Sequence, residues 1–376
     1  MILKNNLSII SYFIIFFLGI FFFNLDYKYS PDVESNIRDV KIFINNQFDL
    51  KILFETLTNN RSIESNVYIT IFIYTIGVLI DNLSLVFFII NFTITLYLFY
   101  LIKFDFDNSK INKFYFHLFC YLYLLNPDLR LWQSFLLIDY FFTVLIFIHF
   151  RFLIKKKFIS SIIILFLLIF IRPTSIFIIP ITFLFFLFNY FFKARNNIQI
   201  YFLILSAILA FVSFSFLFTN VDDLGFFGSK FKFYKDFNIS GIVIHDRWSV
   251  PFEINNFYNL FTLLIIKFFA FYQFLSSDFS IIHNIYNLIY YAPYLFIILM
   301  IFKKIHINDN LYFNEYYLLS FYFFIIYGVC HSILLIDFDW RYRMPLYIPF
   351  IISIIYFLHE CKLDTFLKKI IKNLNI

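Results

Sequence analysis

The sequence predicts an all-α polytopic membrane protein with about ten transmembrane helices. Of its 376 residues, 62% are hydrophobic and only 14% are charged. A soluble fold of this length could not cover so much apolar side chain with so little polar surface. The mean hydropathy is +0.81, and the apolar residues form runs that charged segments separate. Most of these runs approach the length that a bilayer core requires.

The rest of the composition argues against several other classes of protein. The net charge of +6 lies mostly in short clusters beside apolar runs, so it indicates membrane topology rather than nucleic-acid binding. The three cysteines have no paired spacing, which argues against a disulfide framework or a cysteine metal knuckle. With only 6 glycines, the sequence has no glycine-rich phosphate loop and no nucleophile elbow.

Each expected span is an apolar run bounded by polar or charged residues. The expected spans are 7–23, 67–81, 84–102, one crossing within 114–153, 158–171, 176–192, 200–219, 284–302, 316–336 and 346–358. The first keeps its N-terminus in the cytoplasm, because no small-residue cleavage site follows it. The runs 158–171 and 176–192 are short for a core of ~30 Å, so they are expected to be tilted or to lie in a thinned bilayer.

Clusters of lysine and arginine set the orientation, because such clusters stay in the cytoplasm. The markers are Lys155–Lys157, Lys193–Arg195, Lys303–Lys304 and the tail 362–372. With all of them inside, 220–283 must begin and end outside, so 258–277, which carries Lys267, is predicted to be an interfacial helix. The same count of crossings requires 114–153 to cross the membrane once. One of its two apolar pieces is therefore predicted to span the membrane and the other to be re-entrant. The count also leaves Lys103, Lys110 and Lys113 on the external side.

This orientation gives a single membrane domain, 1–376, with two long polar segments outside. The first external loop is 24–66, where the apolar residues of 33–43 and 48–54 predict amphipathic helices on the membrane surface. The second external region is 220–283. Both segments face the same side as the residues just before the last span, which predicts one convergent external site.

Two arginines in the segment Asp337–Pro345 lie between two apolar runs and form a candidate anion site. Arg341 and Arg343 are charged at any working pH and carry forked donors that match phosphate oxygens. Tyr342 between them adds a hydroxyl and a ring face. We expect this cluster to bind the phosphate of a lipid-linked substrate. The alternative is that the arginines only mark the end of a transmembrane helix.

Asp32 and Arg172 are the other candidate site residues. Asp32 follows Pro31 and opens the first predicted surface helix, where it could remove a proton from an acceptor hydroxyl or simply cap the helix. Arg172 is a charge between apolar runs, a place where ionisable groups are usually functional, although a helix break with an interfacial arginine fits equally well. The stretch His245–Trp248 could bind an acceptor or a metal, but a solvated loop is the simpler interpretation.

These residues together resemble the GT-C superfamily of integral membrane glycosyltransferases, which includes the dolichyl-phosphate-mannose protein mannosyltransferases and their bacterial relatives. The resemblance rests on Asp32 in a long first loop, on Arg172-Pro173-Thr174, and on Arg341-Tyr342-Arg343-Met344-Pro345 ahead of the last span. It covers nearly the whole chain, since the family also has seven spans before a second long external loop.

The resemblance implies transfer of a sugar from a polyprenyl-phosphate-linked donor to a lipid, glycan or protein acceptor, without any nucleic acid. Asp32 would be the catalytic base, and Arg172, Arg341, Tyr342 and Arg343 would bind substrate. It implies a bacterial-type inner (plasma) membrane with both termini in the cytoplasm and the active site outside. Bacterial relatives often carry a tyrosine where Asn36 stands and a His-Pro-Pro-like element where Ser65-Asn66-Val67 stands, so participation of a divalent metal ion stays open.

Two other functions stay open. An O-antigen or exopolysaccharide polymerase also has external loops and arginines, but would not depend on a carboxylate of the first loop. A lipid-linked sugar flippase or transporter should show repeated halves and a pathway at mid-membrane. The sequence shows no such repeat, and its charges gather towards one face, which favours an enzyme.

Overall fold

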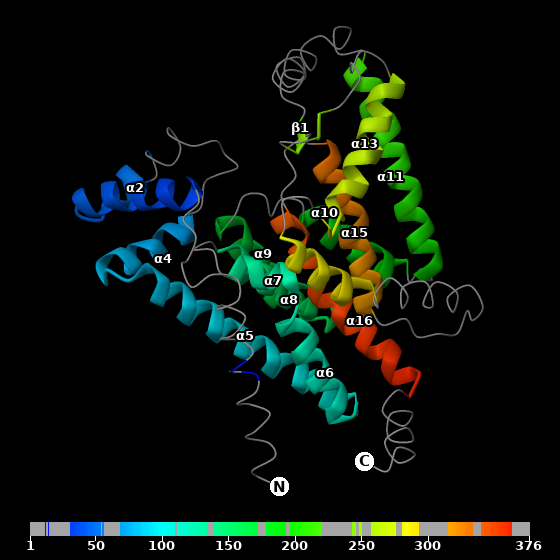
Figure 1. Ribbon diagram of the computed structural model, residues 1–376, viewed down its shortest axis with the longest axis horizontal. Helices are drawn as coiled ribbons and strands as arrows, with labels where there is room; N and C mark the ends of the chain where they lie inside the picture. The colour runs from blue at the N-terminus through cyan, green and yellow to red at the C-terminus, as the bar shows by residue number, and fades with distance from the viewer. Residues whose placement is uncertain are drawn as a thin grey trace. The chain divides into compact units, whose positions relative to one another are not determined.

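The computed structural model shows a predominantly helical chain that divides into two compact units (Figure 1). It describes residues 12, 14, 31–53, 55, 68–109, 111–133, 138–171, 178–192, 196–219, 243–245, 248–249, 257–275, 280–292, 315–333 and 340–362. Unit 1 comprises Met1–Ile179, Pro293–Phe302 and Tyr347–Ile376. Unit 2 comprises Pro180–Ala292 and Lys303–Leu346.

The described part of unit 1 is built from helices. They are α2 (Pro31–Asn45), α4 (Tyr68–Leu79), α5 (Leu83–Asn108), α6 (Lys113–Leu124), α7 (Pro127–Gln133), α8 (Asp139–Ile154), α9 (Phe158–Ile171) and α16 (Tyr347–Glu360). One further element, α10 (Ile178–Phe186), begins in unit 1 and continues into unit 2.

Unit 2 is built from helices and one short hairpin. Its elements are the π-helix η3 (Leu187–Phe191), α11 (Asn196–Thr219), strands β1 (Val243–His245) and β2 (Trp248–Ser249), α13 (Phe257–Phe271), a helix over 281–292, α15 (Glu315–Ile333) and the 3₁₀-helix η5 (Trp340–Leu346).

The helical fold class is confirmed, but fewer spans are shown than the sequence predicted. Within the described residues, the helices Leu83–Asn108 and Ile198–Phe216 are long and apolar enough to cross a bilayer, judged by length and composition. Shorter apolar helices are Ile69–Leu79, Phe158–Ile171, Ile178–Phe191, Phe257–Phe269 and Glu315–Cys330. The predicted count of about ten is therefore not shown by the described helices.

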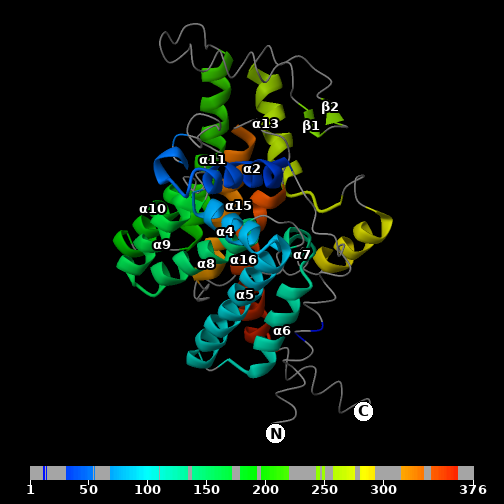
Figure 2. The same cartoon turned by 90° about the vertical axis from the view of Figure 1, so that its left-hand side faces the viewer.

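The amphipathic helix expected from 33–43 is present as α2, which packs on α4 (Figures 1 and 2). Its buried face joins α4 and the first turns of α5 in one apolar cluster, formed by Val33, Val40, Phe43, Leu53, Ile71, Tyr74, Leu83 and Phe87. A side chain at Gly77 would lie 2.4 Å from Leu83 Cδ1, so glycine permits the tight α4–α5 turn. The cluster places α2 at the N-terminal end of α5.

At the opposite end of α5, Asp105 forms a buried ion cluster with the last turn of α8. The Arg151 guanidinium binds the carboxylate with both arms, Nε at 2.7 Å and Nη2 at 2.8 Å. Lys155 Nζ donates to the same carboxylate. Asp105 is 7% exposed and Arg151 is 5% exposed. The C-terminal ends of α5 and α8 therefore lie together.

This contact corrects the predicted topology of 103–113. That segment was expected outside and Lys155–Lys157 inside, yet Asp105 binds Lys155 directly. The start of α6 lies at the same end as the end of α16, since the Tyr115 hydroxyl donates to the carbonyl of Leu358 at 3.2 Å. The segment 103–113 therefore shares one end of unit 1 with two of the cytoplasmic markers. The parity count failed because it gave too little weight to the charges of this segment.

The same geometry argues against the prediction that 114–153 crosses once, which stays a prediction. Helix α6 starts beside the end of α16, and α8 finishes beside Asp105, at the same end of unit 1. The chain therefore runs away from this end along α6, turns at α7, and returns along α8. Helix α9 runs back again, because Ser161 near its start bonds His149 near the end of α8, at 2.9 Å.

A cysteine-accessibility experiment can check this arrangement. We expect a cysteine at Ser109 to react from the same side of the membrane as the native, exposed Cys361. A cysteine at Ile80, which is 57% exposed in the α4–α5 turn, should react from the other side. The measurement is labelling by a membrane-impermeant maleimide before and after permeabilisation, with Cys361→Ser as the background for both variants. Labelling of the Ser109 variant in intact cells, with labelling of the Ile80 variant only after permeabilisation, would restore the original assignment.

Unit 2 contains a three-helix bundle of α11, α13 and α15, which lie side by side in both views (Figures 1 and 2). Leu260, Leu263, Leu264 and Phe268 of α13 pack with Phe211 of α11 and Val329 of α15. A side chain at Gly328 would lie 2.5 Å from the Phe268 ring, so close packing of α13 on α15 requires glycine there.

The prediction that 258–277 is an interfacial helix stays a prediction, and the bundle adds contacts that it did not include. Helix α13 packs against α15 and against α11, one of the two candidate spans. Lys267, the residue that motivated the prediction, is 2% exposed. A charge in an apolar run is compatible with a bundle helix when the bundle encloses it. The sequence shows the charge but not the neighbouring helices.

Candidate functional site

The end of unit 1 opposite Asp105 holds a group of buried polar residues around α7. Asn126 caps α7, since its Oδ1 accepts the backbone N–H of Leu129 at 2.9 Å. Pro127 then occupies the first helical position, where a missing N–H costs nothing. Asn126 and Asp128 are each 1% exposed and Arg130 is 2% exposed. The local sequence Asn-Pro-Asp thus builds a helix start that is enclosed by the bundle.

Asp128 joins α7 to α16. The hydroxyl of Tyr347, the first residue of α16, donates to Asp128 Oδ2, a contact between residues 219 positions apart in the sequence. Arg130 in turn donates from Nε to the carbonyl of Leu124 at the end of α6. The hydrogen bond from Tyr347 holds the Asp128 carboxylate, and the bond to Leu124 holds the Arg130 guanidinium. Both groups belong to the short helix α7.

Helix α8 adds a second buried carboxylate and a hydroxyl network at this end. Asp139, the first residue of α8, is 4% exposed. Its neighbour Tyr140 bonds the hydroxyls of Thr95 and Tyr123, each at 2.6 Å. Helix α8 runs from Asp139 to Ile154, so Asp139 lies about 18 Å along the axis from Arg151. We name Asn126, Asp128, Arg130, Asp139 and Tyr347 the polar end of unit 1.

Helix α2 packs on the first turns of α5, away from the end that carries Asp105. Asp32 is the second residue of α2, and its side chain is outside the described set. Asn36 and Asp39, on the following turns, are 4% and 0% exposed. The described packing of α2 is with α4 and the start of α5, whereas Tyr140 bonds Thr95, twelve residues after Leu83.

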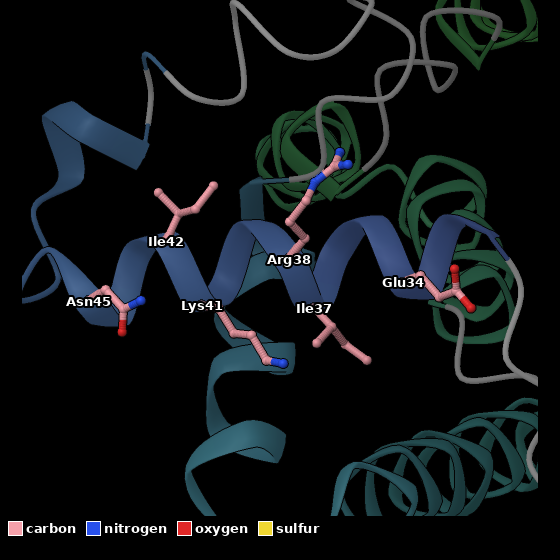
Figure 3. Close-up of a pocket in the computed structure, with 6 residues that line it drawn as sticks. All are labelled: Glu34, Ile37, Arg38, Lys41, Ile42 and Asn45. Carbon is pink, nitrogen blue, oxygen red and sulfur yellow. The ribbon is translucent and has the colours of Figure 1, made fainter.

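The exposed side of α2 forms an open hollow of about 540 Å³. It is lined by Glu34, Ile37, Arg38, Lys41, Ile42 and Asn45. Figure 3 shows that Arg38 and Ile42 project from one side of the helix and Ile37 and Lys41 from the other. Because one helix supplies every lining residue, the hollow is a mixed apolar and charged surface rather than an enclosed site.

The other predicted site residues are only partly described. Arg172 lies just beyond the end of α9 and outside the described residues. Arg341 and Tyr342 belong to η5, but their side chains are outside the described set. The two units are not placed relative to each other, so convergence of Asp32 with the arginine cluster stays a prediction. Strands β1 and β2 pair as an antiparallel hairpin at His245–Trp248.

Arg343 has a structural role in unit 2. Its guanidinium is buried, and Nη1 donates to the carbonyls of Phe271 at 3.2 Å and Gln273 at 2.6 Å. These carbonyls lie at the C-terminal end of α13, where four backbone acceptors lack helical partners and positive charge is favourable. Arg343 therefore holds the end of α13, a role that the sequence prediction of phosphate binding did not include.

Substitution of Arg343 can separate the structural task from phosphate binding. Arg343→Met should destabilise the protein by about 1–3 kcal/mol, because it leaves two buried carbonyls without their charged donor. Arg343→Lys should recover part of the loss, since an ammonium can still donate. The measurement is thermal unfolding in detergent beside donor affinity. A large loss of donor affinity with unchanged unfolding would instead assign Arg343 to the phosphate.

The polar end of unit 1 and the Asp105 cluster were missed as sites by sequence reasoning. Sequence reasoning treated Asn126–Arg130, Asp139 and Arg151 only as parts of the segment 114–153. The available signal was the presence of ionisable residues inside apolar runs, where they are rare and functional by default. Among the described residues, no three His, Cys, Asp or Glu side chains are grouped as candidate metal ligands.

No family model, curated protein or solved structure matches this chain. Its class is therefore stated from the fold and the candidate site alone. It is a predominantly helical protein with two helices that are long and apolar enough to cross a membrane. One end of its first unit encloses two carboxylates, an arginine and a tyrosine.

Proposed function

We propose that the protein is an integral membrane glycosyltransferase of the GT-C type. It moves a sugar from a polyprenyl-phosphate-linked donor to an acceptor on the external face, in the assembly of cell-envelope glycans or glycoconjugates. The observation that carries the proposal is the polar end of unit 1, where Asp128, Arg130 and Asp139 are buried. Sugar transfer needs a carboxylate for the acceptor proton and cationic help for the leaving phosphate.

The proposed topology retains seven crossings before the second external region but reassigns them. They are 7–23, α5, α6, α8, α9, α10 with η3, and α11. Helix α4 stays with α2 at the external end and does not cross, because its buried residues pack with α2 and the start of α5. This assignment puts Lys103, Lys110 and Lys113 inside, as the preference of lysine for the cytoplasmic side requires.

The catalytic tasks are divided among the predicted residues. Asp32 is the general base towards the acceptor hydroxyl. Arg341 and Arg172 stabilise the donor phosphate as the glycosidic bond breaks, because a guanidinium in a partly dry site can stabilise developing charge more than water does. Arg343 holds α13 and positions the residues next to it in η5. Tyr342 lies between the two arginines and binds substrate with them.

The test is to incubate membranes containing the protein with radiolabelled polyprenyl-phosphate monosaccharides and to follow the label. The proposal expects label to leave the donor and to appear in an acceptor, with release of polyprenyl phosphate. Membranes carrying the Asp32→Asn variant are the matched control. Growth of lipid-linked oligosaccharides into polymer, without consumption of the monosaccharide donor, would indicate a polymerase instead. Movement of intact donor between leaflets would indicate a flippase.

A further inference from the structure

Contacts within unit 1 bring six lysines from three distant segments to one end. We name Lys103, Lys113, Lys155, Lys156, Lys157 and Lys362 the lysine end of unit 1. Asp105 binds Arg151 and Lys155, which joins the end of α5 to the turn after α8. The ring of Tyr115 packs against that of His359 with centroids 5.1 Å apart, which joins the start of α6 to the end of α16.

The lysine end is positively charged where it meets solvent. Five of the six lysines are exposed, and Lys155 is partly exposed. Asp105 is buried with Arg151, so among the described residues of these three segments the exposed carboxylates are Asp107 and Glu360. Lysines therefore outnumber acids on this surface, and the surface favours an anionic partner.

Exposed apolar side chains lie next to the lysines in the chain and distinguish a lipid from a soluble anion. On α5, Tyr100 and Phe104 are 63% and 49% exposed. At the start of α9, Phe158 and Ile159 are 37% and 78% exposed. A phospholipid fits this arrangement at the end of a candidate span. Its anionic head group can bind the lysine amines, and its acyl chains can pack on the neighbouring apolar and aromatic side chains.

We infer that the lysine end of unit 1 is a binding site for anionic phospholipid head groups, such as phosphatidylglycerol, on the cytoplasmic leaflet. The phosphodiester accepts hydrogen bonds and charge from ammonium groups of three segments, so bound lipid also holds the ends of α5, α8 and α16 together. This inference rests on the membrane location within the proposed function, and not on sugar transfer. The site lies at the end of unit 1 opposite Asp128, so its loss and loss of catalysis are separable.

The experiment is native mass spectrometry of the full-length protein, released from micelles that hold equal amounts of phosphatidylglycerol and phosphatidylcholine. We expect the wild type to retain phosphatidylglycerol at least about tenfold more than phosphatidylcholine, given about fivefold per lysine near an anionic surface. Replacement of Lys103, Lys113, Lys156 and Lys157 by Gln should bring the ratio within about twofold of one, while their replacement by Arg should preserve it. Lys155 is left in place because it binds Asp105.

The matched control is the pair Lys41→Gln and Lys51→Gln, two exposed lysines of the α2 region at the other end of unit 1, which should leave the ratio unchanged. Equal retention of both lipids by the wild type would overturn the inference. The same holds if the Arg variant loses the preference as the Gln variant does, because charge would then not be the cause. Displacement of phosphatidylglycerol by millimolar inorganic phosphate would show a general anion site. Labelled sugar transfer, measured in parallel, reports on the proposed function separately.

Discussion

Replacement of Asp32 by asparagine is expected to lower sugar transfer by about 10²–10⁴-fold, the range that general acid–base help supplies. Asparagine keeps the size of the side chain, but it cannot accept the proton of an acceptor hydroxyl. The protein should therefore remain inserted and abundant. The measurement is turnover of labelled donor at saturating concentration, normalised to protein in the membrane.

Glu34→Gln is the matched control for this prediction. Glu34 lies on the same helix two residues away and is exposed. Its variant should keep wild-type turnover if Asp32 alone is the base. Near-normal transfer by Asp32→Asn together with a collapse in Glu34→Gln would move the catalytic role to Glu34. Normal transfer in both variants would remove the first external loop from the chemistry.

Replacement of Asp105 by asparagine should lower the free energy of unfolding by about 3–5 kcal/mol, the usual cost of breaking a buried ion pair. Arg151 is 5% exposed and would lose the carboxylate that compensates its desolvation. The ends of α5 and α8 would then hold two neighbouring cations, Arg151 and Lys155. Reversible unfolding in mixed micelles, followed by tryptophan fluorescence, measures the change.

Two further variants test the cause of this effect. Lys155→Met should cost at most about 1 kcal/mol, because the side chain is partly exposed and its charge is already solvated. The double variant Asp105→Leu with Arg151→Met should recover much of the lost stability, since an apolar pair needs no compensation in a bundle. If Asp105→Asn alone is as stable as the wild type, the ion cluster does not fasten α5 to α8.

Composition and hydropathy determined the helical class, because 62% hydrophobic residues in long runs are poorly suited to any soluble fold. The amphipathic pattern of 33–43 was sufficient to predict α2, since local periodicity fixes which face of a helix is apolar. Helix caps at Asn82 and Asn126 also follow local rules. These features depend on neighbours in sequence, so the sequence alone specifies them.

The direction of each helix and the partners of each charge were decided only by the tertiary structure. In the sequence, Asp105 is one charge of a mixed-charge segment. The tertiary structure places Arg151 of α8 beside it, although Arg151 is 46 residues away in the sequence. In the sequence, Arg343 is a candidate phosphate ligand. The tertiary structure shows that it donates to a carbonyl at the end of α13. Topology counted from charges is a parity argument, in which one wrong crossing reverses every later assignment. A single long-range contact between two helix ends constrains this count, because the two ends then lie at the same end of the bundle.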